Sequence, residues 1–357
     1  MSDSFEIQSH IGPYRVHFVA DGPAKANTFA SEAVHFLVDQ RVAGLYSSQL
    51  KGVLTAPSVL LIEANEHSKS LEEMPGYVRH LAAHGFRRNS RLVAIGGGVI
   101  QDITCFLSAT MMRGVDWSFF PTTLLAQADS CIGSKSSINV GDAKNIMGTF
   151  TPPREVFIDV TFLDTLAEHD VRSGVGEILK VHAIDGPESF DALARDYDRL
   201  FSDKATMIAY IRRALSIKKP YIEEDEFDRT SRQIFNYGHS FGHAIETATD
   251  FAVPHGIAVT MGMDLANFAA ARLALVGADT FERMHPLLKR NYRGYEAVPV
   301  AMEPFLAALR RDKKNVGTHE VTVIMPGPDG RPRHVRRAAD RQFSDVCAEF
   351  FMTARGN

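Results

Sequence analysis

The stretch that decides the fold is Arg91-Leu92-Val93-Ala94-Ile95-Gly96-Gly97-Gly98-Val99-Ile100-Gln101-Asp102. Its first part, Arg91–Ile95, is mostly apolar and branched, which is typical of a buried strand. Three glycines follow, and the run through Cys105–Leu107 indicates the start of a helix. A strand, a glycine turn and a helix make a cradle for phosphate, because backbone N–H groups and a helix N-terminus can approach an anion closely. The turn is not the Gly-x-Gly-x-x-Gly dinucleotide motif, and tight geometry alone would also explain it.

Strands and helices alternate around this stretch through the first half of the chain. An N-terminal hairpin is expected, because Phe5–Ile11 and Tyr14–Phe18 flank the turn Gly12-Pro13. Further strands, separated by helical stretches such as Tyr77–His84, are expected at Val34–Val38, Val59–Ile62, Leu92–Ile95 and Val156–Asp159. This alternation predicts an α/β layer with a mainly parallel sheet.

Beyond Pro152-Pro153 and the last of these strands, the hydrophobic period becomes that of helices. Helices are expected at Leu163–Ala183, Ala205–Glu224, Arg232–Thr249, Ile257–Leu275 and Phe281–Lys289. A late strand pair, Val321–Met325 and His334–Arg337, brackets a Gly-Pro-Asp-Gly turn. We therefore predict an α/β domain at residues 1–159 and a mostly α-helical domain at residues 160–357.

Composition narrows the class of protein. A chain of 357 residues can bury a sizeable core, and its net charge of -4 argues against a nucleic-acid or membrane-surface partner. The cysteines Cys105, Cys131 and Cys347 are far apart, so neither a disulfide framework nor a thiolate zinc site is indicated. No apolar run is long enough to span a membrane, and the first residues lack the regions of a signal peptide. We expect a cytoplasmic enzyme.

A second informative stretch is Asn236-Tyr237-Gly238-His239-Ser240-Phe241-Gly242-His243, which His255-Gly256 follows. His239 and His243 are four residues apart, so on a helix they share one face, about one turn apart. Imidazole is a common zinc ligand, and two or three imidazoles with a carboxylate make an open catalytic site. The spacing alone equally fits two surface histidines.

Several further short motifs surround these two stretches: Arg113-Gly114, Pro121–Asp129, Gly133-Ser134-Lys135, Asn139, Lys144-Asn145, Gly176–Lys180, Lys218, Asp225-Glu226, Arg232 and Arg311–Asn315. In their order and separations, they resemble the 3-dehydroquinate synthase family of sugar-phosphate cyclases. The resemblance runs from about Glu66 to Asn315. It implies an N-terminal Rossmann-like domain with a mainly parallel sheet and a mostly α-helical C-terminal domain.

The resemblance implies that the N-terminal domain binds NAD. The family positions that serve the cofactor correspond to Asp39, Glu66, Lys69, Gly97, Gly98, Asp102, Thr122, Thr123 and Lys144. A carboxylate can accept the ribose hydroxyls, and glycine N–H groups can meet the pyrophosphate. Without the family pattern, Glu66 and Lys69 would be interpreted as a solvated surface pair.

The resemblance also divides the histidines by role. Glu177, His239 and His255 are the implied metal ligands, a set that suits catalytic Zn²⁺ or, in its place, Co²⁺. His243 would then hold the substrate or relay a proton, although spacing alone would more naturally pair His239 with His243. Taken by itself, Glu177 could be an ordinary glutamate on the surface of a helix.

The resemblance implies a substrate that carries both a phosphate and a carboxylate. The cationic side chains expected to bind these groups are scattered through the sequence: Arg113, Lys135, Lys180, Lys218, Arg232, Lys313 and Lys314. Arginine offers bidentate recognition of a carboxylate, and lysine offers a point charge to phosphate. Asp129, Asn145 and Asn236 are expected to hydrogen-bond the substrate hydroxyls. Taken singly, each cation could be an ordinary surface charge.

The implied reaction is the shikimate-pathway conversion of 3-deoxy-arabino-heptulosonate 7-phosphate to 3-dehydroquinate and phosphate. It comprises oxidation, β-elimination, reduction and intramolecular aldol closure, catalysed by a carbon–oxygen lyase that we expect to be a homodimer. Two alternatives stay open: a paralogous cyclase acting on sedoheptulose 7-phosphate or an amino analogue, and a metal-dependent polyol-phosphate dehydrogenase. Five positions depart from the family pattern and bear on the exact substrate: Gln101, Ser134, Val140, Phe227 and Ile257.

Overall fold

The computed structural model describes residues 4–141, 143–311 and 320–356. The chain forms two compact units: unit 1 is residues 1–167 with 219–228, and unit 2 is residues 168–218 with 229–357. This division differs from a single cut after residue 159. The chain leaves unit 1 later, and it returns there with the last residues of helix α9 (Lys204–Glu224) and the turn after them.

A seven-stranded sheet forms the centre of unit 1, and its order is β1-β2-β9-β6-β5-β3-β4. The strands are β1 (Ser4–Ile7), β2 (Tyr14–Phe18), β3 (Val34–Asp39), β4 (Val59–Ile62), β5 (Arg91–Gly96), β6 (Trp117–Pro121) and β9 (Glu155–Ile158). Only the β1–β2 pair is antiparallel among the pairings of this sheet. The expected mainly parallel sheet with an N-terminal hairpin is confirmed, and β6 is a strand that the sequence analysis missed.

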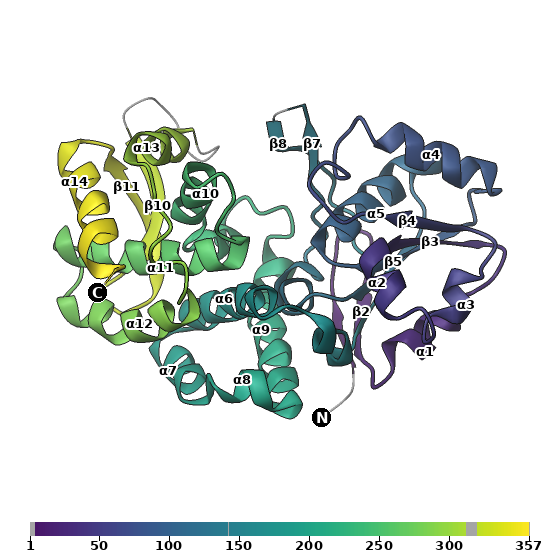
Figure 1. The fold of residues 1–357 in the computed structure, drawn as a ribbon, viewed down its shortest axis with the longest axis horizontal. Helices are drawn as coiled ribbons and strands as arrows, with labels where there is room; N and C mark the ends of the chain where they lie inside the picture. The colour runs from purple at the N-terminus through teal and green to yellow at the C-terminus, as the bar shows by residue number, and fades with distance from the viewer. Residues whose placement is uncertain (1–3, 142, 312–319, 357) are drawn as a thin grey trace. The chain divides into compact units, whose positions relative to one another are not determined.

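Helices cover this sheet because its strands are apolar on both faces. In Figure 1, α4 (Met74–Ala83) and α5 (Gly98–Thr110) are drawn on one side of β3, β4 and β5. The short helices α1 (Gly22–Asn27), α2 (Gln40–Leu45) and α3 (Lys51–Leu54) are drawn on the other side. The core includes Phe36 and Val38 of β3, Val93 and Ile95 of β5, and Phe120 of β6, all fully buried. Further helical segments are η1 (Met111–Arg113), η2 (Ala126–Ser130) and η3 (Val160–Thr165).

The pairing of the strands positions the loops that carry polar residues. Val38 of β3 pairs with Ile95 of β5, and Gly96 of β5 pairs with Pro121 of β6. Because these strands are parallel, the loops that follow them begin at one edge of the sheet, where ligands bind in open α/β sheets. A separate antiparallel pair, β7 (Ile138–Val140) and β8 (Ala143–Met147), completes unit 1.

Unit 2 is mostly helical, as expected, with one antiparallel strand pair, β10 (Glu320–Pro326) and β11 (Pro332–Ala338). Besides part of α9, its helical segments are α6 (Glu168–Asp185), α7 (Pro187–Asp196), α8 (Arg199–Ser202), η4 (Ser231–Asn236), α10 (His239–Ala248), α11 (His255–Arg272), α12 (Ala278–Asn291), α13 (Met302–Arg310), α14 (Arg341–Glu349) and η5 (Phe350–Ala354).

Two expected helices begin later than the hydrophobic pattern suggested. The helix expected over Arg232–Thr249 is interrupted at Gly238, whose φ of 78° is left-handed, so that α10 begins only at His239. The helix expected from Leu163 begins at Glu168, because Val160–Thr165 forms a separate 3-10 turn that Asp159 caps. In both cases a local turn overrides the hydrophobic period.

Close helix packing organises unit 2 around α11, which is buried from Gly256 to Ala270. A Cβ atom on Gly176 of α6 would lie 2.3 Å from the carbonyl oxygen of Gly256, and one on Gly262 of α11 would lie 2.1 Å from that of Gly238. Glycine is therefore required where α6 and α10 meet α11. These contacts bring together the three helices that carry Glu177, His239 and His255 (Figure 1).

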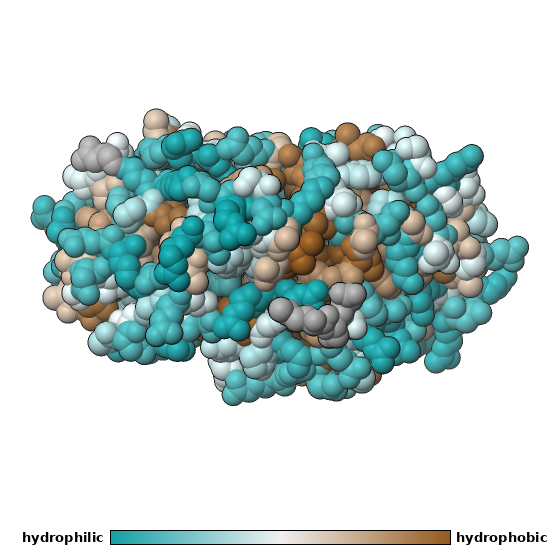
Figure 2. Space-filling view, turned by 90° about the horizontal axis from the view of Figure 1, so that it is seen from below, coloured by the Kyte–Doolittle hydropathy of each residue, from teal (hydrophilic) through white to brown (hydrophobic). Residues whose placement is uncertain are grey.

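Hydrophilic residues cover most of the face drawn in Figure 2, with apolar residues showing among them. Within the part of the chain that the structure describes, no helix is both long and apolar enough to cross a membrane.

Candidate active site

Three histidines of unit 2 converge at the N-terminal ends of two helices. His239 begins α10, His255 begins α11, and His243 lies one turn after His239. One ring nitrogen from each histidine can be chosen so that all three atoms lie within 4.8 Å of one another. Such a group can hold a divalent metal ion. The expectation that His239 and His243 share one helix face is confirmed.

The carboxylate of Glu177 lies beside this group and is almost completely buried, with 1% of its surface exposed. Its Oε1 atom is 3.4 Å from Nε2 of His255 and 3.7 Å from Nε2 of His239. Its Oε2 atom is 2.6 Å from Nζ of Lys180. One carboxylate oxygen thus faces the imidazoles while the other holds the ammonium group, which rules out the reading of Glu177 as a surface residue.

The far nitrogens of two histidines also have partners. Nδ1 of His239 lies 3.4 Å from the carbonyl oxygen of Tyr237, and Nδ1 of His255 lies 3.3 Å from each carboxylate oxygen of Glu246. Both rings therefore present Nε2 to Glu177. This is the orientation in which a histidine commonly binds a metal while its other nitrogen is fixed by a hydrogen bond.

Charge in this cluster is set by the close contacts. Burial by itself raises the pKa of Glu177, but the ammonium of Lys180 and the imidazole of His255 outweigh it and lower that pKa below its usual range. Burial lowers the pKa of His255, whereas its hydrogen bonds to Glu177 and Glu246 raise it to about 10. Metal binding at Nε2 requires the neutral imidazole, so it competes with protonation of His255.

Three cations of unit 2 are buried, and two of them lie near one aromatic ring. Lys180, Lys218 and Arg232 are 1%, 6% and 5% exposed, respectively. The ammonium groups of Lys180 and Lys218 lie 5.8 Å and 5.9 Å from the ring centre of Phe235, close enough for cation–π attraction. Lysine and arginine are seldom buried to this extent. The reading of these three residues as solvated surface charges is wrong.

In unit 1, the glycine turn forms the N-terminus of a long helix. Gly97 is the N-cap residue of α5, and no side chain caps that helix. A Cβ atom on Gly97 would lie 2.9 Å from Cγ2 of Thr123, whereas one on Gly98 would meet open space. The backbone N–H of Thr122 donates to the carbonyl oxygen of Gly96 and joins the ends of β5 and β6. An uncapped helix N-terminus with open space before it suits a phosphate group.

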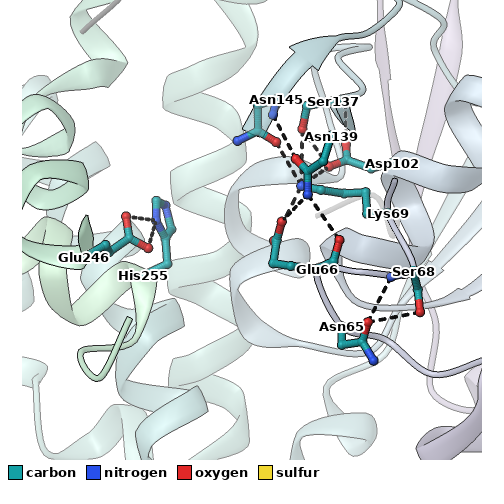
Figure 3. Close-up of polar contacts among 10 residues, drawn as sticks. All are labelled: Asn65, Glu66, Ser68, Lys69, Asp102, Ser137, Asn139, Asn145, Glu246 and His255. Atoms are coloured by element: carbon teal, nitrogen blue, oxygen red, sulfur yellow. Dashed lines mark hydrogen bonds and ion pairs between the residues drawn. The ribbon is translucent and has the colours of Figure 1, made fainter. Parts of the chain in front are cut away.

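Lys69 is the centre of a polar network next to this turn (Figure 3). Its ammonium group lies 3.1 Å from Oδ2 of Asp102, 3.0 Å from Oδ1 of Asn145 and 3.6 Å from Oε1 of Glu66. Burial raises the pKa of Asp102, and the neighbouring ammonium of Lys69 opposes that rise. The structure thus brings Glu66, Lys69 and Asp102 together with Asn145, which contradicts the interpretation of Glu66 and Lys69 as a merely solvated pair.

Two residues of this network were not among the predicted site residues. The hydroxyl of Ser137 donates to Asp102 at 2.8 Å, and Nδ2 of Asn139 donates to Oε2 of Glu66 at 2.9 Å. Asn139 was recognised as part of a motif but was given no role. Ser137 lies between two recognised motifs, Gly133-Ser134-Lys135 and Asn139, but nothing in the sequence marks this serine as a partner of Asp102.

Lys135 lies elsewhere in unit 1, where it forms an ion pair with Asp228. The preceding residue, Ser134, has a φ of 65°, and its hydroxyl donates to Oε1 of Glu226 at 2.6 Å. The other oxygen of Glu226 accepts the backbone N–H of His10 at 2.7 Å. The returning segment 219–228 therefore positions Lys135 through two acidic side chains.

Two residues of unit 1 at which the chain departs from the family pattern make contacts of their own. Gln101 exchanges hydrogen bonds with Ser130, because its Nε2 donates to the carbonyl oxygen and its Oε1 accepts the hydroxyl. Phe227 packs edge-on against Phe150, with the ring centres 5.1 Å apart. In unit 2, Ile257 is fully buried in α11.

The remaining predicted residues lie at separate places. Asp39 ends β3, where its Oδ1 accepts the N–H of Arg41 at 2.8 Å, and burial raises its pKa although this hydrogen bond opposes the rise. Arg113 follows α5 with a left-handed φ of 67°. Asp129 lies in η2, Lys144 is exposed on β8, and Asn236 ends η4. Lys313 and Lys314 lie outside the described residues.

Comparison with known proteins identifies the family. Two family profiles match consecutive parts of the chain: 3-dehydroquinate synthase N-terminal over residues 59–173 and 3-dehydroquinate synthase C-terminal over residues 174–315. The 3-dehydroquinate synthase of Dictyoglomus turgidum (strain DSM 6724 / Z-1310) is 36% identical over 295 residues, which are 82% of either protein. The chain belongs to the 3-dehydroquinate synthase family. It is accordingly an enzyme of the sugar-phosphate cyclases, carbon–oxygen lyases that act on phosphates.

Solved structures of similar proteins agree with this fold. The structure of 2-epi-5-epi-valiolone synthase from Streptomyces hygroscopicus subsp. jinggangensis 5008, with NAD+ and Zn2+ bound, has a TM-score of 0.80 at 27% identity and covers 95% of this chain and 96% of its own. The structure of 2-deoxy-scyllo-inosose synthase with carbaglucose-6-phosphate, NAD+ and Co2+ also has a TM-score of 0.80. At 21% identity, over 97% of this chain and 99% of that one, it supports the fold alone.

Proposed function

We propose that this enzyme is a metal- and NAD-dependent cyclase that converts 3-deoxy-arabino-heptulosonate 7-phosphate to 3-dehydroquinate and phosphate. The observation that carries the proposal is the burial of Lys180, Lys218 and Arg232 in the unit that holds the three histidines. Lysine and arginine are seldom buried, and three such cations in one unit suit an anionic ligand. A substrate that carries both phosphate and carboxylate is such a ligand, and Arg232 is the cation suited to bidentate contact with the carboxylate.

The side chains of unit 2 fit a divalent metal ion. Imidazole nitrogens and one carboxylate oxygen are donors that zinc and cobalt accept, and they already lie within a few ångströms of one another. We assign Glu177, His239 and His255 as ligands, because both histidines turn Nε2 toward the same oxygen of Glu177. His243 is then left to contact the substrate or relay a proton.

The glycine turn of unit 1 fits the pyrophosphate of NAD. Gly98 leaves open space at the uncapped start of α5. Asp39 ends β3 and Glu66 follows the neighbouring strand β4, and both carboxylates can accept ribose hydroxyls. Two related enzymes of known structure hold NAD+ with Zn2+ or Co2+. We propose that this enzyme uses the same pair of cofactors, with Gly97, Asp102, Thr122, Thr123, Lys69 and Lys144 completing the NAD site.

When bound, the metal supplies Lewis acidity at substrate oxygens, and NAD supplies a reversible hydride acceptor. The chain itself supplies orientation and charge. Lys180, Lys218 and Arg232 bind the anionic groups of the substrate, and Asn236 hydrogen-bonds a hydroxyl. We assign Asp129 and Asn145 to further hydroxyls and Arg113, Lys135, Lys313 and Lys314 to the remaining anionic contacts.

A paralogous cyclase remains the second candidate, because structures of two cyclases with other names match the fold at a TM-score of 0.80. The buried Arg232 favours the carboxylated substrate. The cation-rich site argues against the third reading, a polyol-phosphate dehydrogenase, since such a substrate lacks the carboxylate. Location in the cytoplasm and a homodimeric state stay predictions.

A substrate panel tests the proposal. The purified enzyme with Zn2+ and NAD is incubated with 3-deoxy-arabino-heptulosonate 7-phosphate, with sedoheptulose 7-phosphate and with glycerol phosphate, and phosphate release is followed. We expect release from the heptulosonate alone, with the carbocyclic product detected by mass spectrometry. Release from sedoheptulose 7-phosphate alone would replace the proposal with the paralogous cyclase.

A further inference from the structure

Glu246 is a second carboxylate near the proposed metal site, and it contacts the side of the His255 ring that faces away from Glu177. It follows His239 by seven residues and His243 by three on α10, so all three side chains share one helix face. Its side chain is 12% exposed, and each of its carboxylate oxygens lies 3.3 Å from Nδ1 of His255. Figure 3 shows the carboxylate facing the ring edge of His255. Glu246 thus joins α10 to the first residue of α11.

The ring of His255 is held between two carboxylates. Glu246 faces Nδ1, and Oε1 of Glu177 lies 3.4 Å from Nε2 on the opposite side. A neutral imidazole has one N–H and one lone pair. An N–H on Nδ1 that donates to Glu246 leaves the lone pair on Nε2, which is the atom that faces Glu177 and the other imidazoles. The side chain of His255 is 35% exposed. Packing therefore constrains its ring less than it would constrain a fully buried ring.

We propose that Glu246 is a positioning residue that keeps the proton of His255 on Nδ1 and thereby directs Nε2 to the divalent metal. Glu246 contacts the nitrogen that faces away from Glu177, so it acts through His255 instead of taking a place among the ligands. The inference rests on the proposed metal site, because His255 must be a ligand for its tautomer to matter.

A purely structural role is the competing explanation. A carboxylate near the N-terminus of α11 also interacts favourably with the helix dipole, and it links two packed helices. Loss of that role would lower stability without changing the geometry at the metal. The two explanations therefore differ in metal affinity and in the spectrum of the bound ion.

The experiment compares the wild-type enzyme with Glu246→Gln and Glu246→Ala. Zn2+ affinity is measured by competition with a chromophoric chelator, and the ligand field is read from the visible absorption of the Co2+-loaded proteins. Asp264→Asn is the matched control, because Asp264 is a fully buried carboxylate on α11, the helix of His255, and it accepts hydrogen bonds from His285 and Tyr292. Circular dichroism checks the fold of each variant.

We expect Glu246→Ala to weaken Zn2+ binding by about 10–100-fold and to change the Co2+ spectrum. Glu246→Gln should retain part of the affinity, because its amide oxygen still accepts the Nδ1 proton, and it carries the test if the alanine variant does not fold. Asp264→Asn should lose stability yet keep the wild-type affinity.

Unchanged Zn2+ affinity and an unchanged Co2+ spectrum in both folded Glu246 variants would overturn the inference. A wild-type enzyme that binds no stoichiometric metal would overturn the proposed metal site itself, and that result is distinct from a failure confined to Glu246.

Discussion

Gly256 of α11 donates its backbone N–H to the hydroxyl of Ser173 on α6 at 2.9 Å, and a Cβ atom on Gly256 would lie 1.9 Å from the carbonyl oxygen of Ser173. His255 precedes this contact on one helix, and Glu177 follows it by one turn on the other. The approach of two backbones therefore sets the spacing between a carboxylate and an imidazole of the site. Residues that touch no ligand define its geometry.

The first prediction follows from this contact. Gly256→Ala should push α6 and α11 apart, which destabilises the protein by about 1–3 kcal/mol or more and weakens metal binding. Gly44→Ala is the control, because a Cβ atom there meets nothing within 4 Å and the residue lies inside a helix. Urea unfolding and Zn2+ stoichiometry measure the two effects. If Gly256→Ala matched Gly44→Ala in stability and in Zn2+ stoichiometry, the contact between the two backbones would not set the geometry of the site.

The second prediction concerns the metal ligands. Alanine at Glu177, His239 or His255 should abolish stoichiometric metal, because each removes one donor from a small set. His243→Ala should retain the metal and lose turnover. Metal content after dialysis and turnover with added Zn2+ distinguish these outcomes. Loss of metal in His243→Ala with retention in His255→Ala would show that our assignment of the ligands is wrong.

The third prediction concerns Arg232. Removing one side of a buried, charge-assisted pair costs roughly 2–5 kcal/mol, so Arg232→Ala should reduce turnover of the carboxylated substrate by orders of magnitude and leave the metal content intact. Arg229→Ala, at an exposed position nearby in the sequence, is the control and should keep wild-type kcat/KM. Equal activity of the two variants on 3-deoxy-arabino-heptulosonate 7-phosphate would remove Arg232 from carboxylate recognition.

The fourth prediction is a pH dependence of stability at His182, which is 1% exposed on α6. Burial lowers its pKa to about 4, although the nearby Asp185 opposes this shift. The unfolded chain, with a histidine pKa of about 6.5, binds the proton first as pH falls. Stability should therefore be lost between about pH 6.5 and 4, by roughly 3 kcal/mol, and the loss should level off below.

Urea unfolding of metal-free wild type and His182→Gln across this pH range measures that contribution. The wild type should lose more stability than the variant as pH falls. Parallel pH profiles for the two proteins would show that His182 does not titrate as its burial requires.

Much of the fold could be predicted because the deciding signals are local. The apolar run before Gly96-Gly97-Gly98 and the helical period after residue 160 identified the parallel sheet and the helical half. The interruption at Gly238 was missed, because a left-handed glycine leaves the apolar period on both sides intact. Strand β6 was missed as a strand, although its loop residues Thr122 and Thr123 were recognised as a motif.

The residues of the candidate site also include some that the sequence could predict and some that it could not. His239, His255 and Glu177 could be named from motifs, and the structure brings them together. The carboxylates that contact His255 and Lys135 could not be predicted from the sequence. Glu246 contacts His255 only because α10 and α11 pack together, and Asp228 reaches Lys135 only because a segment returns to unit 1. Such partners depend on tertiary packing, which no local pattern records.

The central claim is that the enzyme performs a redox-neutral cyclisation, and one reaction tests it most directly. The purified enzyme with Zn2+ and a small amount of NAD is given 3-deoxy-arabino-heptulosonate 7-phosphate, while free phosphate and reduced nicotinamide are followed together. We predict many phosphates released for each NAD present, 3-dehydroquinate as the product, and no accumulation of NADH. Accumulation of NADH in step with product would contradict this account and identify a dehydrogenase.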